Sequence, residues 1–291
     1  MYADNSFLME KRLRDLDPGL HEGFINSVFA MKRALSGFVR FFPSFTDHSS
    51  IHSMEVLEFC NTILGPDQLE ELNADEIYVL LMSCYLHDSG MCVTEKDYEA
   101  FKDQAGAAEY FAEYPDRGPS DFIRDWHQEL SGLFIRKYAD MLEIPSEAYV
   151  HAIVQVSRGH RKTDLYDEKE YPSAFDMGNG RSVCLPYLAA LIRLADEVDV
   201  IENRNPKLLY DTSALTDEKD IICFGMHEAI YRMDITDDGF DVYAKTDDEE
   251  MYAAVMKMTR KMQDTLDLCR DVVSSRTRFE IRQSQVRLIR T

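Results

Sequence analysis

Apolar residues recur at intervals of three or four along most of this chain, which is the spacing of helices with one buried face. Asp75 stands where a helix N-cap is expected, and Gly65-Pro66 is a stop signal. The polar, glycine-containing residues 163–181 are typical of a long loop that covers a site. The pattern predicts a mainly α fold. The predicted helices cover residues 51–64, 76–87, 120–142, 145–156, 185–201 and 249–274.

Nearer the C-terminus the pattern changes to the alternation of strands. Residues 230–235 and 240–245 are predicted to form a β-hairpin, because the Asp-Gly pair between them favours a tight turn. We therefore expect two domains. A helical domain would cover residues 1–205, and a smaller unit over residues 206–291, made of the hairpin and a C-terminal helix, would pack on it.

The chain is acidic and has enough apolar residues for a large core. Of its 291 residues 45% are hydrophobic, and 53 acidic against 32 basic residues give a formal net charge of −21. This charge argues against general nucleic-acid binding, which needs a basic surface. A small phosphorylated substrate stays compatible, since a metal ion and a few cations can reverse the field inside one pocket. Residues 276–291 carry five arginines and one acid, so they could dock on the acidic body or lead into a further segment.

Cysteine usage and hydropathy predict a cytoplasmic protein. The six cysteines form no Cys-x-x-Cys pair, and Cys60 and Cys84 lie among apolar residues as reduced core thiols would. The N-terminus has no apolar signal core. No apolar run approaches the ~20 residues that a membrane span needs.

The pair His87-Asp88 ends a long apolar run. A histidine beside a carboxylate at a buried helix end is costly unless something binds both, and a divalent metal is the usual reason. One histidine on an apolar face is more often a satisfied core residue, but here further residues of the same types lie in other predicted helices. They are His52, His127, His160 and Asp196. Imidazole with carboxylate suits Fe, Mn, Zn, Ni or Co, whereas carboxylate and water alone would suit Mg.

In this order and with their flanking residues, these positions resemble the HD-domain superfamily of metal-dependent phosphohydrolases. Residues 46–53 resemble its first-histidine segment, and residues 86–91 its signature turn. Residues 124–131 resemble the R-x-x-H-x-x-x-S helix of some branches, and residues 191–199 the closing aspartate helix. The resemblance covers roughly residues 20–205 and implies an HD-domain helical bundle. It is closest to bacterial HD modules, some of which precede an Hsp90-like ATPase in longer proteins.

The resemblance implies a centre with one or two divalent ions per chain, and we favour two. The ligands of the first ion would be His52, His87, Asp88 and Asp196. Two further histidines, His127 and His160, match those of branches that bind a second ion, with Asp88 bridging the two. The chain lacks the Gly-Tyr-Pro signature and the adjacent His-His of the branch that hydrolyses cyclic di-GMP. It also lacks a convincing basic allosteric site of the large dNTP hydrolases. These absences weaken an assignment to either of the two branches.

Other polar residues are candidates for the reaction. Asp88 is assigned a catalytic role, and His48 could act as an acid, contact the substrate, or have no role. Asp199 shares a helical face with Asp196, so it could contact the substrate, orient a ligand, or line a polar groove. Candidate phosphate-binding cations lie near the histidines, although each could equally be a solvated helix end. They are Arg124, Arg158, Arg161 and Lys162.

We predict a hydrolase of a phosphoester, either a nucleotide or a nucleotide-derived signal. A metal makes hydroxide available near neutral pH, and phosphoryl transfer needs mainly positioning and charge neutralisation. One alternative is a non-catalytic HD module that binds a metal or ligand and regulates a partner domain through residues 206–291. Another is a di-iron oxygenase with the same ligands. A homodimer or a downstream partner domain would fit these functions.

Overall fold

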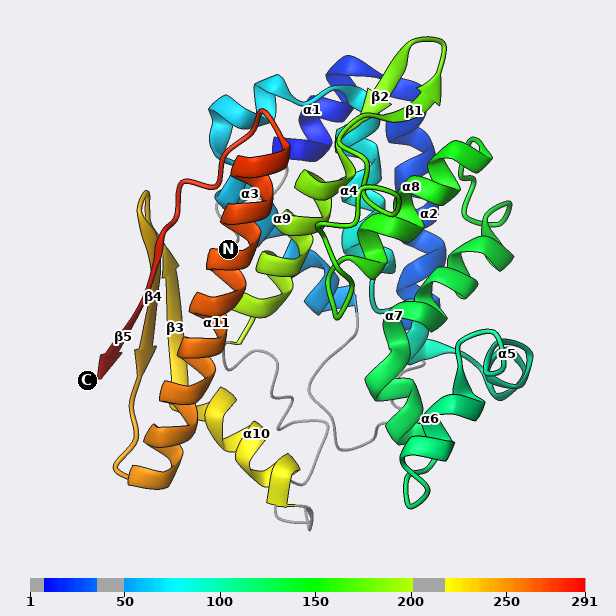
Figure 1. Cartoon of the computed structure of the whole chain (residues 1–291). Helices are drawn as coiled ribbons and strands as arrows, with labels where there is room; N and C mark the ends of the chain where they lie inside the picture. The colour runs from blue at the N-terminus through cyan, green and yellow to red at the C-terminus, as the bar shows by residue number, and fades with distance from the viewer. Residues whose placement is uncertain (1–7, 36–49, 201–217, 291) are drawn as a thin grey trace.

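The computed structural model describes residues 8–35, 50–200 and 218–290, and in these residues the chain is mainly helical, as predicted (Figure 1). The bundle contains α1 (Leu8–Leu16), α2 (Pro18–Leu35), α3 (Ser50–Glu71), α4 (Ala74–Leu86), the 3-10 turn η2 (Ser89–Cys92), α5 (Glu95–Phe101), α6 (Ala107–Glu113), α7 (Pro119–Tyr138), α8 (Glu147–Arg158) and α9 (Leu185–Val198). The C-terminal elements are α10 (Glu218–Ala229), β3 (Ile230–Ile235), β4 (Gly239–Ala244), α11 (Glu249–Arg276) and β5 (Gln285–Arg290). None of these described helices has the length and apolar character that crossing a membrane requires.

Helix α4 lies at the centre of the bundle, and residues 75–86 on it are all buried. It begins with a capping box, in which Asn73 and Glu76 each accept a hydrogen bond from the other's backbone N–H. The cap is therefore Asn73 rather than the predicted Asp75. Helices α1, α2, α3, α8 and α9 pack around α4. A helix that is apolar on all sides belongs in such a position, and its C-terminal end carries His87 into the interior.

Helix α3 continues past the predicted stop. Gly65 has φ 66° and ψ 168°, so the helix kinks there and a second helical segment runs on to Glu71. Proline has no backbone N–H, but the N–H groups in the first turn of a helix have no partner within the helix. Pro66 can therefore begin the second helical segment, and the predicted end of the helix is a kink instead.

The predicted loop at 163–181 leads into a small antiparallel hairpin, β1 (Phe175–Gly178) and β2 (Arg181–Val183), that the pattern did not predict. Three or four residues per strand are too few to show alternation. Other residues of the loop are held against the bundle, since Arg193 on α9 donates to the carbonyl of Thr163 over 2.8 Å.

The C-terminal strands form a sheet in the order β3-β4-β5. Strands β3 and β4 make the predicted antiparallel hairpin, and β5 adds to β4 in parallel. A parallel neighbour needs a long crossover, which α11 supplies. Helix α11 packs on both α9 and β5, so it lies between the sheet and the bundle in Figure 1. The predicted domain boundary at 205/206 lies outside the described residues, and the division stays a prediction.

The arginine-rich C-terminal segment docks on the body of the protein, which is one of the two outcomes that its sequence suggested. Its arginines bind carbonyls or acidic side chains. The contacts join Arg276 to the carbonyls of Leu165 and Tyr171, Arg278 to the carbonyl of Glu71, Arg282 to Asp67, Arg287 to Asp238 and Asp241, and Arg290 to Glu249.

Candidate metal centre

Six side chains, all of the ligands that the resemblance implied, meet inside the bundle. They are His52 on α3, His87 and Asp88 at the end of α4, His127 on α7, His160 just after α8, and Asp196 on α9. The four histidines and Asp88 are buried. Two groups with the spacing of a metal site share Asp88, one with His52 and His87 and one with His127 and His160.

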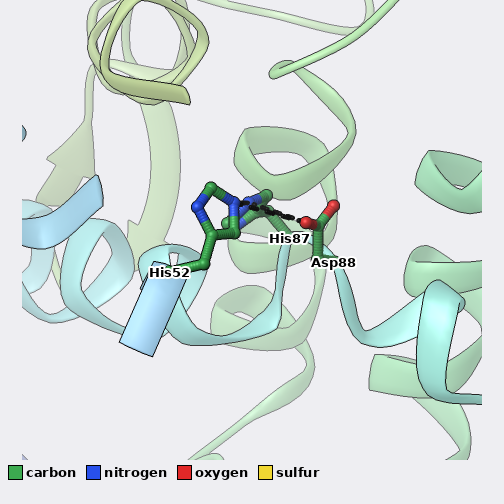
Figure 2. Close-up of side chains that lie close together, drawn as sticks. All are labelled: His52, His87 and Asp88. Carbon is green, nitrogen blue, oxygen red and sulfur yellow. Dashed lines mark hydrogen bonds and ion pairs between the residues drawn. The ribbon is translucent and has the colours of Figure 1, made fainter. Parts of the chain in front are cut away.

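The first group is centred on His52. Its Nε2 lies 3.2 Å from Nε2 of His87, 3.4 Å from Oδ2 of Asp88 and 3.3 Å from Oδ1 of Asp196. Nε2 of His87 lies 3.5 Å from the same oxygen of Asp88. Figure 2 shows the two rings and the Asp88 carboxylate turned toward one another. Two imidazoles and two carboxylates therefore surround one small space.

The second group uses the other oxygen of Asp88. Nε2 of His127 lies 3.3 Å from Oδ1 of Asp88, and Nε2 of His160 lies 3.6 Å from it. The two Nε2 atoms of this group are 2.9 Å apart. Asp88 thus presents one oxygen to each group, which is the arrangement that a bridging carboxylate requires.

The outer nitrogen of each ring, Nδ1, has a hydrogen-bond acceptor. For three histidines it is the backbone carbonyl three residues earlier, and a carbonyl can only accept, so Nδ1 carries the proton and Nε2 offers its lone pair. These contacts are His87 to Cys84 at 3.0 Å, His127 to Arg124 at 2.7 Å, and His160 to Ser157 at 2.5 Å. His52 is different, because its Nδ1 lies 2.5 Å from Oδ2 of Asp199.

The donor set fits a divalent metal. Lone pairs that face each other at 2.9 and 3.2 Å repel unless a positive charge lies between them. Two nitrogens bound to one ion at about 2.1 Å each lie about 3.0 to 3.4 Å apart for angles between 90° and tetrahedral at the ion, close to these separations. Burial, with His87 and His127 nearby, holds the pKa of His160 well below its ordinary value, so the ring is neutral and able to bind metal.

Asp196 supplies the second carboxylate of the first group. Burial by itself would raise the pKa of its carboxyl, but the contact with the His52 ring and the nearby His87 hold that pKa well below its usual range. The carboxylate is therefore ionised at neutral pH, as a metal ligand must be.

The turn η2 brings α7 against the end of α4 and so places His127. A Cβ at Gly90 would lie 2.2 Å from the carbonyl oxygen of His127, so only glycine allows this approach. Oγ of Ser131 accepts from the N–H of Gly90 at 2.8 Å and donates to the carbonyl of His87 at 2.5 Å. Ser131 had no predicted role of its own, although the serine of the R-x-x-H-x-x-x-S pattern was a signal for one.

Close packing of α8 on α9 places His160. A Cβ at Gly159 would lie 2.6 Å from Cβ of Ala189, and Nε of Arg193 donates to the carbonyl of Gly159 over 2.6 Å. The residue before His160 is thus fixed to the helix that carries Asp196.

Two predicted substrate contacts have partners within the protein. Asp199 is fully buried and binds His52. Arg158 makes two parallel hydrogen bonds of 3.0 and 2.9 Å with the carboxylate of Glu129, which tie α8 to α7. The structure thus gives each residue a supporting position beside the centre, while contact with a substrate stays a prediction for both.

The other predicted contacts lie at the surface. Arg124 and Arg161 are exposed. Lys162 donates from Nζ to the carbonyl of Asp125 at 2.9 Å, and Nζ lies 4.4 Å from the centre of the Trp126 ring. His48 lies outside the described residues, so its predicted role stays a prediction.

Comparison with known proteins agrees with this architecture. The profile of the HD-CE family matches residues 42–276, a range that contains all six residues of the centre. Comparison with the curated proteins, and separately with the solved structures, gave no significant match. The expected association with an Hsp90-like ATPase therefore stays a prediction. Since the family profile covers most of the chain, the protein belongs to the HD-CE family and has an HD-type helical domain whose buried histidines and aspartates could hold metal.

Proposed function

We propose that this protein is a metal-dependent phosphohydrolase whose substrate is a nucleotide or a nucleotide-derived signal. The observation that carries the proposal is the inward orientation of four Nε2 atoms and of both Asp88 oxygens. The first ion would be held by His52, His87, Asp88 and Asp196, and the second by Asp88, His127 and His160. When bound, the ions would lower the pKa of a water molecule and neutralise phosphoryl oxygens.

The charges of the groups around the centre favour two ions over one. Histidine binds metal as neutral imidazole, whereas the carboxylates of Asp88, Asp196 and the adjacent Asp199 contribute −3. One divalent ion would leave +2 − 3 = −1, which repels a phosphate group. Two would leave +4 − 3 = +1, a local positive charge inside a protein whose net charge is −21. A phosphoester is therefore attracted only by the doubly loaded centre.

Cations near the second group could bind the rest of the substrate. Arg161 and Lys162 directly follow His160, and Arg124 lies one helical turn before His127. The ammonium group of Lys162 has three N–H donors, and one of them donates to the carbonyl of Asp125. We assign these residues to contacts with substrate oxygens, because the two histidines that they flank would hold the second ion.

The test is hydrolysis of a phosphoester panel by chelator-treated protein to which Mn²⁺, Fe²⁺, Co²⁺ or Zn²⁺ is returned. The panel contains nucleoside mono- and triphosphates, cyclic nucleotides and bis(p-nitrophenyl) phosphate. We expect turnover that the chelator abolishes and metal restores, and none in Asp88→Ala. His151→Ala is the matched control, since this histidine of α8 stacks on Phe175 with 4.9 Å between ring centres and lies outside the centre.

Two outcomes would replace the proposal. Metal uptake without hydrolysis of any phosphoester would point to a ligand-binding module that regulates a partner. Iron-dependent oxygen consumption without hydrolysis would point to an oxygenase.

A further inference from the structure

We infer that the two metal positions are unequal, and that Asp199 is a positioning residue that makes the His52 position the tighter one. This inference rests on the proposed metal centre. It concerns the order in which the positions fill and the residue that sets it.

The two carboxylates at the end of α9 hold opposite sides of one imidazole ring. Oδ1 of Asp196 lies 3.3 Å from Nε2 of His52, and Oδ2 of Asp199 lies 2.5 Å from Nδ1 of the same ring. The backbone N–H of Asp199 donates to the carbonyl of Asp196 at 3.3 Å, so both carboxylates belong to one turn. Because Asp199 is fully buried, its charge acts on His52 without screening by solvent.

Among the four histidines, His52 has a charged acceptor where the other three have a neutral carbonyl. A carboxylate that accepts from the outer nitrogen fixes the ring and makes the inner nitrogen a stronger ligand. Such outer partners are commonly worth 10- to 100-fold in metal affinity. The position with His52 therefore gains an advantage that the position with His127 and His160 lacks.

Charge acts in the same direction. The first position is adjacent to three carboxylates, the buried Asp88 and Asp199 and the partly buried Asp196, whereas the second group shares only Asp88. A divalent ion is thus neutralised in the first position and only partly neutralised in the second. We expect the second ion to bind more weakly and to be completed by an anionic group of the substrate.

The experiment is a titration of chelator-treated protein with Mn²⁺ by calorimetry and with Co²⁺ by visible absorption. Wild-type protein should bind in a tight step and a weaker step. His127→Ala and His160→Ala should each keep the tight step and lose the weak one. Asp199→Asn should weaken the tight step about 10- to 100-fold and shift the Co²⁺ spectrum of the first equivalent, while the weak step stays.

The matched control is Glu197→Gln, an equally small change on the same turn of α9. The carboxylate of Glu197 binds Nζ of Lys261 at 2.8 Å, and we expect wild-type binding in both steps.

Several results would overturn the inference while leaving the metal centre in place. One is two binding steps of equal affinity in the wild-type protein. Another is a His127→Ala variant that keeps the weak step and loses the tight one. A third is a folded Asp199→Asn variant that either keeps the wild-type tight step or shows both steps weakened equally. If Asp199→Asn does not fold, the two histidine variants still decide which position is tighter. Failure of the wild-type protein to bind any metal would instead contradict the proposed function itself.

Discussion

At the scale of single residues, the centre depends on which nitrogen of each histidine faces inward. His87 is the C-cap of α4, and His160 lies just beyond α8, where helix carbonyls have no partner in the next turn. His127 follows Trp126, whose φ of −126° and ψ of 16° kink α7. Each ring binds the carbonyl three residues earlier. A helix end or kink thus fixes the tautomer through a local contact.

Asp97 allows a residue-scale prediction about stability. Its buried carboxylate accepts from Lys137 at 2.5 Å, from Thr94 at 2.7 Å and from Tyr138 at 2.9 Å. Burial would raise its pKa, but these hydrogen bonds and the charge of Lys137 outweigh burial, so the pKa of Asp97 lies below its ordinary value. The ionised form therefore stabilises the fold above the unfolded pKa of about 3.9, and this gain is lost as the pH falls through the lower folded pKa.

We expect Asp97→Asn to lower the free energy of unfolding by about 1–2 kcal/mol at pH 7, a value reduced because Lys137 is partly exposed. The difference from wild type should shrink as the pH approaches 3. Urea denaturation of both proteins at pH 7, 5 and 3.5 measures it. A difference that grows on acidification would contradict the assignment.

The sequence predicts the ligands better than it predicts their supports. The six candidate ligands could be found because each lies in a recognisable local pattern. The contact between Asp199 and His52 spans 147 positions and depends on where α9 ends against α3. A spacing of three from Asp196 shows a shared helical face, but it cannot show which ring that face meets.

At the scale of elements, α4 carries one half of the centre and α7 and α8 bring the other. The bonds of Arg158 to Glu129 join α8 to α7 close to His160 and His127. Ser131 joins α7 to the turn after α4. The spacing between the two groups is therefore set by helix packing, with Gly90 as the narrowest contact.

Gly90→Ala tests this packing. The new Cβ would lie 2.2 Å from the carbonyl oxygen of His127, so η2 and α7 must separate. We expect the free energy of unfolding to fall by about 1–3 kcal/mol, and the second metal position to be lost before the first. Gly118→Ala is the control, because nothing lies within 4 Å of a Cβ there. Wild-type metal uptake and stability in Gly90→Ala would show that α7 does not depend on this contact.

The pattern did not predict α1, α2 and α10, and the other elements that it did not predict are short or depend on distant partners. Helices α5 and α6 have seven residues each, which is about two turns and too few for a clear period. Strand β5 pairs with β4 across the whole of α11, so its neighbour could not be read from local sequence. The β3-β4 hairpin and the helices α3, α4, α7, α8, α9 and α11 were predictable because local spacing or turn chemistry specifies them.

At the scale of the whole molecule, an acidic body is bound by a basic C-terminal segment. Contacts of its arginines reach the 163–181 segment, the end of α3, the sheet and the start of α11. These contacts are of two kinds, since some guanidinium groups bind buried carbonyls and others bind exposed carboxylates. The two kinds should differ in strength and in their response to salt.

Arg276→Gln and Arg282→Gln separate these two kinds of contact. Arg276 donates to the carbonyls of Leu165 and Tyr171, two buried residues that would lose their donors. We expect a loss of about 1–3 kcal/mol that salt does not change. Arg282 pairs with Asp67 over 3.1 Å, and Asp67 is 80% exposed. The loss in Arg282→Gln should be smaller than the loss in Arg276→Gln and should disappear in 1 M salt, because exposed pairs are weak and screened.

Urea denaturation in low and high salt measures both values. Equal losses for the two variants, or a loss in Arg276→Gln that salt removes, would mean that the segment is held by general attraction to the acidic body. A salt-independent loss confined to Arg276→Gln would mean that directed hydrogen bonds to the 163–181 segment hold it. The net charge of −21 would then affect how firmly the remaining arginines attach, but not where the segment lies.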